Sequence, residues 1–328
     1  MAASAHPVGV VVVAYNTKRF WPRLKAALEA QTFQDWRLIV VDNASAPDER
    51  LHATDLPANA TLIQSEVNLG FAAANNLAVR DFDCEFVALL NPDAFPEPTW
   101  LAELLAAATR WPQAAAFGST QWLAHEPGIC DGEGDELFAL GLPYRASHRR
   151  RVTQLAPEGP AFSACAAAAL YRRADFEAVG GFDPDFFAYC EDLDLGYRLR
   201  LIGRISVQAP SAAVAHVSGG VSARTSRFAA RYGARNRLWT FVKNTPPILF
   251  WLLLAPHLLA SAVWLFAAAI RNGHGAGLAG FGEGLAAFGA TLRKRADVQR
   301  TRKVSSAAIA ATLVWSPFKL AARRRKAS

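Results

Sequence analysis

The sequence predicts an α/β fold whose core is a mostly parallel, doubly wound sheet, followed by a helical C-terminal region. Through the first hundred residues, apolar runs of strand length alternate with helix-length segments, as in a sheet built from strand–helix–strand units. After residue 245 the pattern changes to Ile248–Ile270, a run of 23 residues without formal charge, followed by basic segments. We therefore expect two regions, residues 1–245 and residues 246–328.

The first hundred residues contain continuous β-branched and apolar runs, which are typical of strands buried on both faces. We expect strands at Val8–Ala14, Trp36–Val41, Ala60–Gln64 and Phe86–Leu90. Apolar residues at helical spacing predict helices at Phe20–Ala30, Gly70–Arg80 and Thr99–Arg110. Thr99 is the expected N-cap of the last of these helices.

The pattern is weaker beyond residue 120. Gln121–Pro160 is rich in Gly, Pro and charge and includes the acidic segment Asp131–Glu136, so we expect a long irregular segment that is functional or mobile. The later elements of this region are expected to be a strand at Ala166–Arg172, a helix at Asp192–Leu201 and two short strands at Ile205–Gln208 and Ala212–His216.

The net charge of +7 is unevenly distributed along the chain. From Arg271 onward there are 12 basic and two acidic residues, whereas the first 270 residues carry 23 basic and 26 acidic ones. This asymmetry is typical of a tail that meets an anionic surface. A nucleic-acid partner is not expected, because the basic runs lack interleaved aromatic residues. Four widely spaced cysteines indicate neither a zinc site nor a disulfide framework, and no signal peptide is recognised.

Polar residues follow three of the predicted strands: Tyr15-Asn16, Asp42-Asn43 and Asn91-Pro92-Asp93. Ligands of such sheets bind beyond the carboxyl ends of the strands, so we expect these residues to face a ligand. A carboxylate there suits an oxygen-rich Mg²⁺ or Mn²⁺ site, and Asp42 suits a nucleobase or ribose. The alternative for Asn91-Pro92-Asp93 is a proline turn that ends the strand, and the alternative for Asp42 is a turn or helix cap. The Gly-x-Gly-x-x-Gly and P-loop motifs are absent, which argues against a dehydrogenase and a P-loop NTPase.

Three further groups are candidates for chemistry. Asn68-Leu69-Gly70-Phe71 with Asn75 has the form of a polar loop that opens a helix, which suits phosphate oxygens or simple capping. Glu191, Asp192 and Asp194 begin another helix, where successive side chains point about 100° apart, so only one of them can face a site while the others cap the helix. His216 ends a short strand and is either structural or a second metal ligand beside Asp93.

In their order along the chain, these motifs resemble family 2 glycosyltransferases of the GT-A fold, within them the rhamnosyltransferase-like branch. The resemblance covers roughly residues 7–245. The motifs that carry it are Val11–Asn16, Val40–Ser45, Asn68–Phe71 with Asn75, Leu90–Ala94, Val179–Asp183, Phe186–Leu195 and His216.

The resemblance implies a role for each matching residue. It implies that the nucleotide sugar is bound by Tyr15, Asn16, Asp42, Asn68, Asn75, Asn91 and Arg235. It implies Asp192 as the catalytic base, Asp93 and His216 as ligands of Mg²⁺ or Mn²⁺, and Glu191 and Tyr189 as residues beside the acceptor. Asn91 departs from the family pattern, because it stands where a D-x-D motif has its first carboxylate.

The function implied is an inverting, metal-dependent transfer of a sugar from a nucleotide donor to a lipid-linked or polysaccharide acceptor in cell-envelope glycan synthesis. Rhamnose from dTDP-rhamnose is the donor that the subfamily resemblance suggests. One carboxylate base fits direct displacement, since a pair of flanking carboxylates is the arrangement of glycosidases. The alternative is a non-catalytic scaffold that binds a nucleotide sugar at a membrane.

The uncharged run Ile248–Ile270 is long enough to span a bilayer, which needs about 20 residues. A single span would carry the basic tail across the membrane, against the positive-inside rule. We therefore expect a re-entrant or interfacial helix pair broken near Pro256, with the tail on anionic headgroups at the cytoplasmic face of the plasma (inner) membrane. The alternatives are a single span, a helical hairpin packed on the rest of the protein and an oligomer interface.

Overall fold

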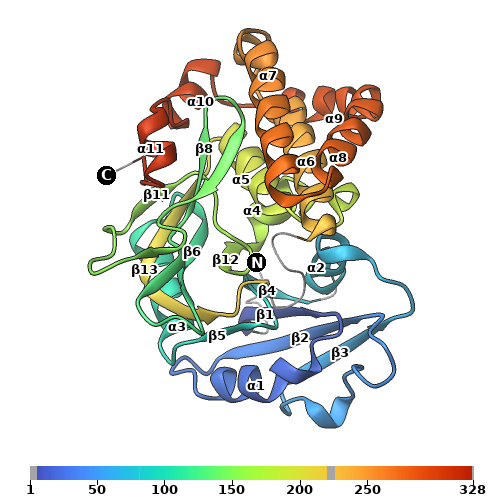
Figure 1. Cartoon of the computed structure of the whole chain (residues 1–328). Helices are drawn as coiled ribbons and strands as arrows, with labels where there is room; N and C mark the ends of the chain where they lie inside the picture. Colours follow the sequence, from blue (N-terminus) through green and yellow to red (C-terminus); the bar gives the residue numbers. More distant parts are fainter. Residues whose placement is uncertain (1–5, 81, 220–225, 327–328) are drawn as a thin grey trace.

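The structure is a computed structural model that describes residues 6–80, 82–219 and 226–326. Within these residues an 11-stranded sheet has the main order β10-β7-β6-β12-β4-β1-β2-β3 (Figure 1). Its parallel part consists of β1 (His6–Ala14), β2 (Trp36–Asn43), β3 (Ala60–Ser65) and β4 (Cys84–Leu90). Beyond β4 the sheet is mixed, because β12 (Ala168–Arg172) runs antiparallel between β4 and β6 (Ala114–Leu123). The expected α/β fold with a parallel-dominated central sheet is confirmed.

Helices cover both faces of the sheet because successive side chains of its strands point to opposite faces. Val8, Val10 and Val12 pack in one core with α1 (Trp21–Glu29) and α3 (Trp100–Arg110). Val11 and Val13 pack in a second core on the other face. That core includes side chains of α2 (Gly70–Arg80), α4 (Arg173–Ala178) and α5 (Glu191–Leu201). The strands and helices expected in the first 110 residues are all present, with shifts of one or two residues at most ends.

The prediction of an irregular segment over residues 121–160 was wrong. This stretch contains the end of β6 and five short strands: β7 (Ile129–Gly132), β8 (Asp135–Phe138), β9 (Leu142–Arg145), β10 (Arg150–Arg151) and β11 (Gly159–Ala161). β8 and β9 form a separate antiparallel hairpin. The two short strands expected at residues 205–216 form one strand, β13 (Ile205–His216), whose register against β6 shifts between Ala209 and Ala213.

The C-terminal third is helical. It comprises α6 (Arg227–Asn244), α7 (Pro247–Asn272), α8 (Ala276–Ala286), α9 (Phe288–Thr301), α10 (Ser306–Thr312) and α11 (Pro317–Ala321). The break expected near Pro256 is absent, because α7 continues through it as one helix. Proline removes one helical hydrogen bond, but Leu253 and His257 on either side are both buried on the same packed face. That packing holds the two halves of α7 in line.

A third core crosses residue 245. It joins Leu137 of β8, Leu193 and Tyr197 of α5, and Phe241 of α6 with Phe250 of α7. The buried residues of α7 recur about every four positions (Leu249, Leu253, His257, Ser261, Leu265), so one stripe of the helix faces the protein. The helical C-terminal region and the sheet-containing region therefore share buried surface.

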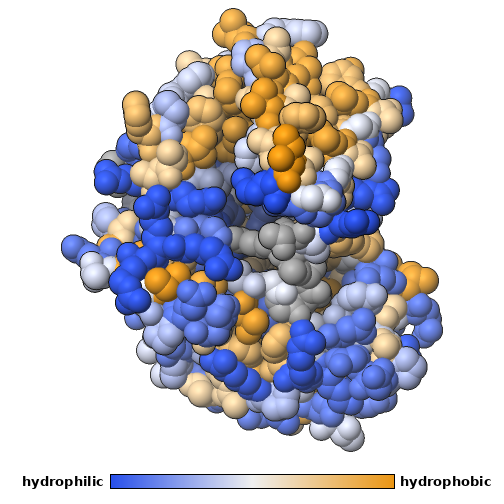
Figure 2. Space-filling model, viewed as in Figure 1, coloured by the Kyte–Doolittle hydropathy of each residue, from blue (hydrophilic) through white to orange (hydrophobic). Residues whose placement is uncertain are grey.

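The outward face of α7 is apolar and exposed. Trp251 is 74% exposed, and Leu252, Leu259, Phe266 and Ile270 are each more than 60% exposed. Figure 2 shows apolar residues gathered at the end of the molecule formed by α7 and its neighbours, above a band of hydrophilic residues. By length and composition α7 is the one helix among the described residues that is able to cross a membrane, which is weak evidence by itself.

Candidate active site

A cavity of about 860 Å³ opens at the carboxyl ends of the parallel strands. Tyr15 follows β1, Asn43 ends β2, and Asn91 and Pro92 follow β4 along its wall. The opposite wall comes from the β8–β9 hairpin and from residues 187–193, which lead into α5. The strand-end residues and the start of α5 thus meet at one cavity, as the sequence predicts for a ligand site.

After β2, the residue that lines the cavity is Asn43 and not Asp42, which was expected at the nucleotide. Both carboxylate oxygens of buried Asp42 accept hydrogen bonds from backbone N–H groups, of Ser45 at 3.0 Å and of Leu51 at 2.9 Å. Asp42 therefore shapes the loop after β2 and does not line the cavity. Its neighbour Asn43 does line it, and the Asn43 amide nitrogen donates to Asn68 Oδ1 at 3.0 Å.

Asn16 and Asn75 also stabilise the backbone around the cavity. Asn16 has a φ of 53°, and its Oδ1 accepts from the N–H of Ala46 at 2.9 Å, which ties the loop after β1 to the loop after β2. Asn75 is buried within α2 and donates to the carbonyl of Phe71 at 2.8 Å. Of the seven residues expected at the nucleotide sugar, Tyr15, Asn68 and Asn91 line the cavity.

Asp93 and His216 come together as expected. β5 (Ala94–Pro96) pairs with the end of β13, which sets Ala94 opposite His216. The Nε2 of His216 lies 3.3 Å from Asp93 Oδ1, and both side chains are almost fully buried. Two ligands on one divalent ion with bonds of about 2.1 Å are about 3 Å apart. The spacing of this pair therefore fits joint coordination of Mg²⁺ or Mn²⁺.

A second carboxylate, which the sequence did not identify, supports this histidine. Asp131 of β7 is fully buried, and its Oδ2 lies 2.9 Å from His216 Nδ1. Arg145 of β9 donates to the same oxygen at 2.8 Å. Burial alone would raise the pKa of Asp131, but Arg145, His148 and His216 hold that pKa well below its usual range. Burial lowers the pKa of His216, but hydrogen bonds to Asp131 and Asp93 raise it overall.

A third group of possible ligands lies on the cavity wall, where one atom each of Asp135, Cys165 and Asp192 fall within 4.8 Å of one another. Arg145 already brings positive charge to this group, since its guanidinium donates to Cys165 Sγ at 2.8 Å and lies 3.7 Å from Asp135. Burial also raises the pKa of the Cys165 thiol to about 12, which keeps it in the poorly ligating protonated form. Arg145 and the protonated thiol thus oppose a cation at this group. Neither Asp93 nor His216 is among the residues that line the cavity, although their neighbour Pro92 is.

The two carboxylates at the start of α5 face the cavity. Asp192 Oδ2 accepts from the N–H of Ala166 at 3.1 Å, and its Oδ1 accepts from the N–H of Leu193 at 2.8 Å. Burial, and then the charge of Asp192, raise the pKa of Glu191 well above its usual range. Glu191 is thus the member of the pair that favours the neutral form. The third acid, Asp194, points away from the cavity into a buried ion-pair network, so the three carboxylates diverge as helical geometry requires.

Residues 9–180 match the family described as "Glycosyl transferase family 2". The chain belongs to glycosyl transferase family 2. It is 30% identical over 239 residues to the N-acetylglucosaminyl-diphospho-decaprenol L-rhamnosyltransferase of Mycobacterium tuberculosis, covering 63% of this chain and 75% of that one. It is 29% identical to the O-antigen chain rhamnosyltransferase WbaN of Salmonella anatum, covering 63% and 65% of the two chains. These likenesses support the rhamnosyltransferase-like branch.

Solved structures support the GT-A fold of this glycosyltransferase. The structure of GalNAc-T7 with UDP, GalNAc and Mn²⁺ aligns with a TM-score of 0.58 at 13% identity, covering 73% of this chain and 48% of that one. The mannosyltransferase PcManGT from Pyrobaculum calidifontis, solved with GDP-Man and Mn²⁺, aligns with a TM-score of 0.50 at 19% identity, covering 90% and 86%. At these identities the likeness shows the fold alone.

Arg235 of the glycosyltransferase does not line the cavity. Its Nη2 donates to the carbonyls of Asp185 at 2.9 Å and Phe186 at 3.1 Å. Its guanidinium also stacks over the rings of Tyr232 and Trp239. Arg235 is therefore not positioned to contact the donor diphosphate as expected, because its guanidinium is hydrogen-bonded to the loop before α5.

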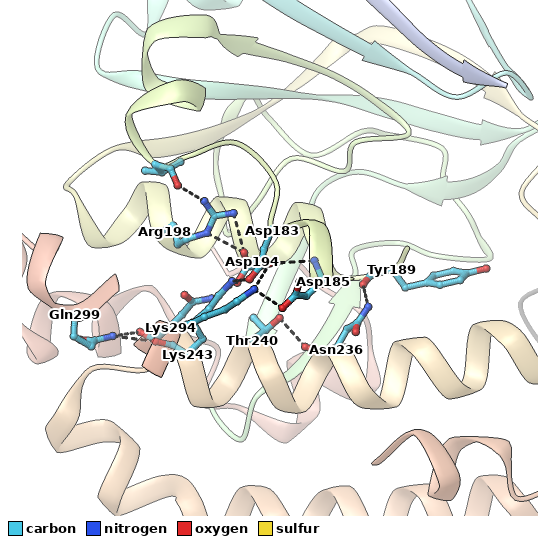
Figure 3. A network of polar contacts seen from close by, with 12 residues as sticks. Asp183, Asp185, Tyr189, Asp194, Arg198, Asn236, Thr240, Lys243, Lys294 and Gln299 are labelled. Carbon is cyan, nitrogen blue, oxygen red and sulfur yellow. Dashed lines mark hydrogen bonds and ion pairs between the residues drawn. The ribbon is translucent and has the colours of Figure 1, made fainter. Parts of the chain in front are cut away.

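An ion-pair network connects α5 and the loop before it to α6 and α9 (Figure 3). Lys243 of α6 bonds Asp183 at 2.7 Å and Asp194 at 2.8 Å. Lys294 of α9 bonds Asp183 and Asp185, both at 2.6 Å. The glycosyltransferase therefore uses two helices of the C-terminal third to hold the segment that carries Glu191 and Asp192. Sequence patterns did not indicate Lys243, Lys294 or Asp131, since each acts through a partner distant in sequence. Asn43 was expected only as one of the polar residues at the strand ends.

Proposed function

We propose that this glycosyltransferase moves L-rhamnose from a dTDP-linked donor to a lipid-linked acceptor in cell-envelope glycan synthesis. The observation that carries the proposal is that Asp192 lines the same cavity as Tyr15 and Asn43 at the strand ends and Asn68 in the loop before α2. A donor bound along the strand ends would present its sugar toward a carboxylate on the other wall. The choice of rhamnose and of a lipid carrier is supported by the name of the Mycobacterium tuberculosis relative.

The chemistry follows from the two walls of the cavity. Asp192 takes the proton from the acceptor hydroxyl, because an alcohol is a poor nucleophile until a base removes that proton. The N–H groups of Ala166 and Leu193 each bond a different oxygen of Asp192 and so fix the plane of the carboxylate. Direct attack on the anomeric carbon with departure of the nucleoside diphosphate inverts the configuration. Glu191, which favours its neutral form, and Tyr189 line the same cavity and would bind the acceptor.

A divalent cation fits the pair of Asp93 and His216, whose facing atoms are 3.3 Å apart in a buried setting. Bound there, Mg²⁺ or Mn²⁺ would supply positive charge that stabilises the departing diphosphate. Neighbouring groups of the chain hold Asp93 and His216 in position. The backbone N–H of Val217 donates to the carbonyl of Asp93 at 2.9 Å, and Asp131 holds the far nitrogen of His216. Mn²⁺ in two solved structures of the same fold supports a divalent cation as the cofactor.

We also propose that the enzyme binds the cytoplasmic face of the plasma (inner) membrane at its surface. The buried stripe of α7 packs in the third core, so only its outer face is available to lipid. Phe318 of α11 is 83% exposed and is a further apolar side chain open to solvent. Exposed basic residues accompany this surface in the same region: Arg271, Arg293, Arg300, Lys303 and Arg324. An apolar face with nearby cations suits an interfacial helix on anionic lipid.

The test is a panel of UDP-, dTDP- and GDP-sugars given to the purified full chain with Mn²⁺ or Mg²⁺ and N-acetylglucosaminyl-diphospho-polyprenol. We expect nucleotide release that depends on the acceptor and is fastest with dTDP-rhamnose. The anomeric configuration of the product, read by NMR, should be opposite to that of the donor. Preference for another nucleotide sugar overturns the donor assignment, and a retained configuration overturns the single-base mechanism.

A further inference from the structure

The segment directly before the carboxylate pair has an unusual backbone. Three of its residues, none of them glycine, have φ in the left-handed region: Phe187 at 63°, Tyr189 at 72° and Cys190 at 65°. Side chains disfavour this region because Cβ approaches the backbone, so such residues persist only where the surroundings impose them. The three positions fall within four residues and end at Cys190, the N-cap of α5.

One buried side chain bonds this backbone at three points. Asn236 of α6 is fully buried, and its Nδ2 lies 2.8 Å from the carbonyl oxygen of Phe186, 2.9 Å from that of Ala188 and 2.8 Å from that of Tyr189, so its two hydrogens are shared among three acceptors. Figure 3 shows Asn236 on α6 beneath Tyr189. Because a carbonyl can only accept, this contact requires the amide nitrogen, and the amide oxygen is left to accept from Arg235 Nε at 2.9 Å.

The other carbonyls of the segment are held from outside it as well. Arg235 donates to those of Asp185 and Phe186, and the N–H of Ala72 in α2 donates to that of Phe187 at 3.2 Å. Gly70 makes room for the same turn, because a Cβ at this position would lie 2.5 Å from the Phe187 ring. The backbone of residues 185–189 is thus fixed by α2 on one side and α6 on the other.

We infer that Asn236, with Arg235 behind it, is a positioning residue that imposes the left-handed backbone before α5 and thereby aims Asp192 and Tyr189 into the cavity. The inference rests on the proposed function for its effect on the rate. It concerns the chain's own backbone and needs no contact between Asn236 and either substrate. The polar atoms of Asn236 are committed to the segment and to Arg235, which is why the pair does not reach the cavity.

The first experiment compares Asn236→Ala with Asn236→Asp in the full chain. We expect Asn236→Ala to lower kcat about 10- to 100-fold, because displacement of a reacting group by about 1 Å has effects of that size. Dissociation constants for donor nucleotides should stay within about twofold, since Tyr15, Asn43 and Asn68 lie on other elements. Asn236→Asp keeps the shape but turns a carboxylate onto three carbonyls, so it should be the more damaging variant.

A glycine background separates positioning from general packing. Cys190 has φ 65° and ψ 4°, a conformation that glycine adopts freely. The fold loss in kcat caused by Asn236→Ala should therefore be at least about threefold smaller in a Cys190→Gly background, measured against Cys190→Gly alone. Thr240→Val is the matched control on α6, because Thr240 is buried one turn away and its hydroxyl bonds the backbone carbonyl of Asn236 and not the segment before α5. It should leave kcat within about twofold.

Hydrogen exchange gives a readout that does not depend on activity. Amides of residues 186–193 should exchange faster in Asn236→Ala than in the wild type, and Thr240→Val should not reproduce this. An unchanged kcat, an equal fold loss in both backgrounds, or unchanged exchange would each overturn the inference. If the wild type transfers no sugar with any donor, the proposed function fails, and the exchange result still decides whether Asn236 holds the segment.

Discussion

His216 Nδ1 lies 2.9 Å from Asp131 Oδ2, although the two residues are 85 positions apart in the chain. The other ring nitrogen of His216 faces Asp93 at 3.3 Å, so the imidazole is held between two carboxylates. A second carboxylate on the far nitrogen fixes the tautomer and the ring orientation of a metal-binding histidine. Asp131 is itself anchored by Ser218 Oγ at 2.9 Å and by Arg145. His216 is therefore part of a connected polar network with Asp93, Asp131, Arg145 and Ser218.

Replacing Asp131 by Asn should weaken cation binding. The substitution leaves His216 in place but removes the charge that fixes its ring, and loss of such a partner typically costs about 10- to 100-fold in metal affinity. Mn²⁺ affinity in the presence of nucleoside diphosphate, measured by electron paramagnetic resonance, checks this. Ser218→Ala is the control, because it removes one hydrogen bond to Asp131 without touching His216. Equal affinities for wild type and Asp131→Asn would show that Asp131 is dispensable for the cation.

Replacing Asp192 by Asn should abolish transfer while donor binding survives. An amide cannot take the acceptor proton, and loss of a general base costs about 100- to 10,000-fold. Turnover and calorimetric donor affinity are measured in parallel. Asp194→Asn is an informative comparison, since Asp194 lies on the same helix but bonds Lys243 and Arg198, so its loss should act mainly on stability. Near-normal turnover in Asp192→Asn is the outcome that removes Asp192 from the role of base.

Much of the fold is encoded locally and was predictable. Val8–Ala14 is apolar throughout and is buried on both faces of the sheet, and the helix expected at Gly70–Arg80 has those bounds in the structure. The strands within residues 121–160 were missed because most have two to four residues, too few to show a period. Their pairing with distant segments, such as β11 with β13, decides their structure. The break predicted near Pro256 is absent for the same reason, since packing of α7 in the third core outweighs the loss of one helical hydrogen bond at the proline.

The location of the site in the fold was predictable from the sequence, but only some of the residues that form it were. The carboxyl ends of β1, β2 and β4 do meet at the cavity, and Asp93 does meet His216. The choice between Asp42 and Asn43 depends on how the chain turns after β2, which adjacent sequence does not reveal. Asp131 and Asn236 act on partners 85 and about 50 residues away, so no spacing motif marks them.

Charges placed on the outer face of α7 should release the enzyme from membranes. The double variant Trp251→Glu, Leu252→Glu adds two charges where both side chains are exposed, so the fold should be retained. Co-sedimentation with vesicles containing anionic lipid should fall about tenfold or more, because desolvating a carboxylate at the interface opposes insertion. Val67→Glu is the matched control, since Val67 is 62% exposed but lies far from the C-terminal helices in sequence. Deletion of residues 246–328 is a poorer test, because it also uncovers the third core.

Equal sedimentation of wild type and the double variant would exclude the α7 face as the membrane contact. Loss of binding in Val67→Glu as well would point to net charge and not to this face. Raising the salt concentration supplies a further check, because the contribution of the exposed arginines is screened while that of the apolar side chains persists.

The stability of the β8–β9 hairpin should depend on pH through Glu136. Burial raises the pKa of this carboxyl from 4.5 to about 7, although Arg325 and Arg200 lower it in part. The folded state therefore holds the proton more tightly than the unfolded state. This contribution is complete below pH 4.5 and is lost as the pH rises through about 7. One pKa unit corresponds to about 1.4 kcal/mol, so the loss amounts to at most about 3 kcal/mol.

Glu136→Gln imitates the protonated form and should remove this dependence. The difference in unfolding free energy between variant and wild type, measured by urea titration, should therefore shift in favour of the variant between pH 5 and pH 8. Other titrating groups are shared by the two proteins and cancel in the difference. Glu126→Gln, which removes a carboxylate from a side chain that is 46% exposed, is the control for loss of charge outside the core. A flat difference for Glu136→Gln would mean that Glu136 is charged in the folded protein, stabilised by Arg325 and Arg200 more strongly than burial opposes it.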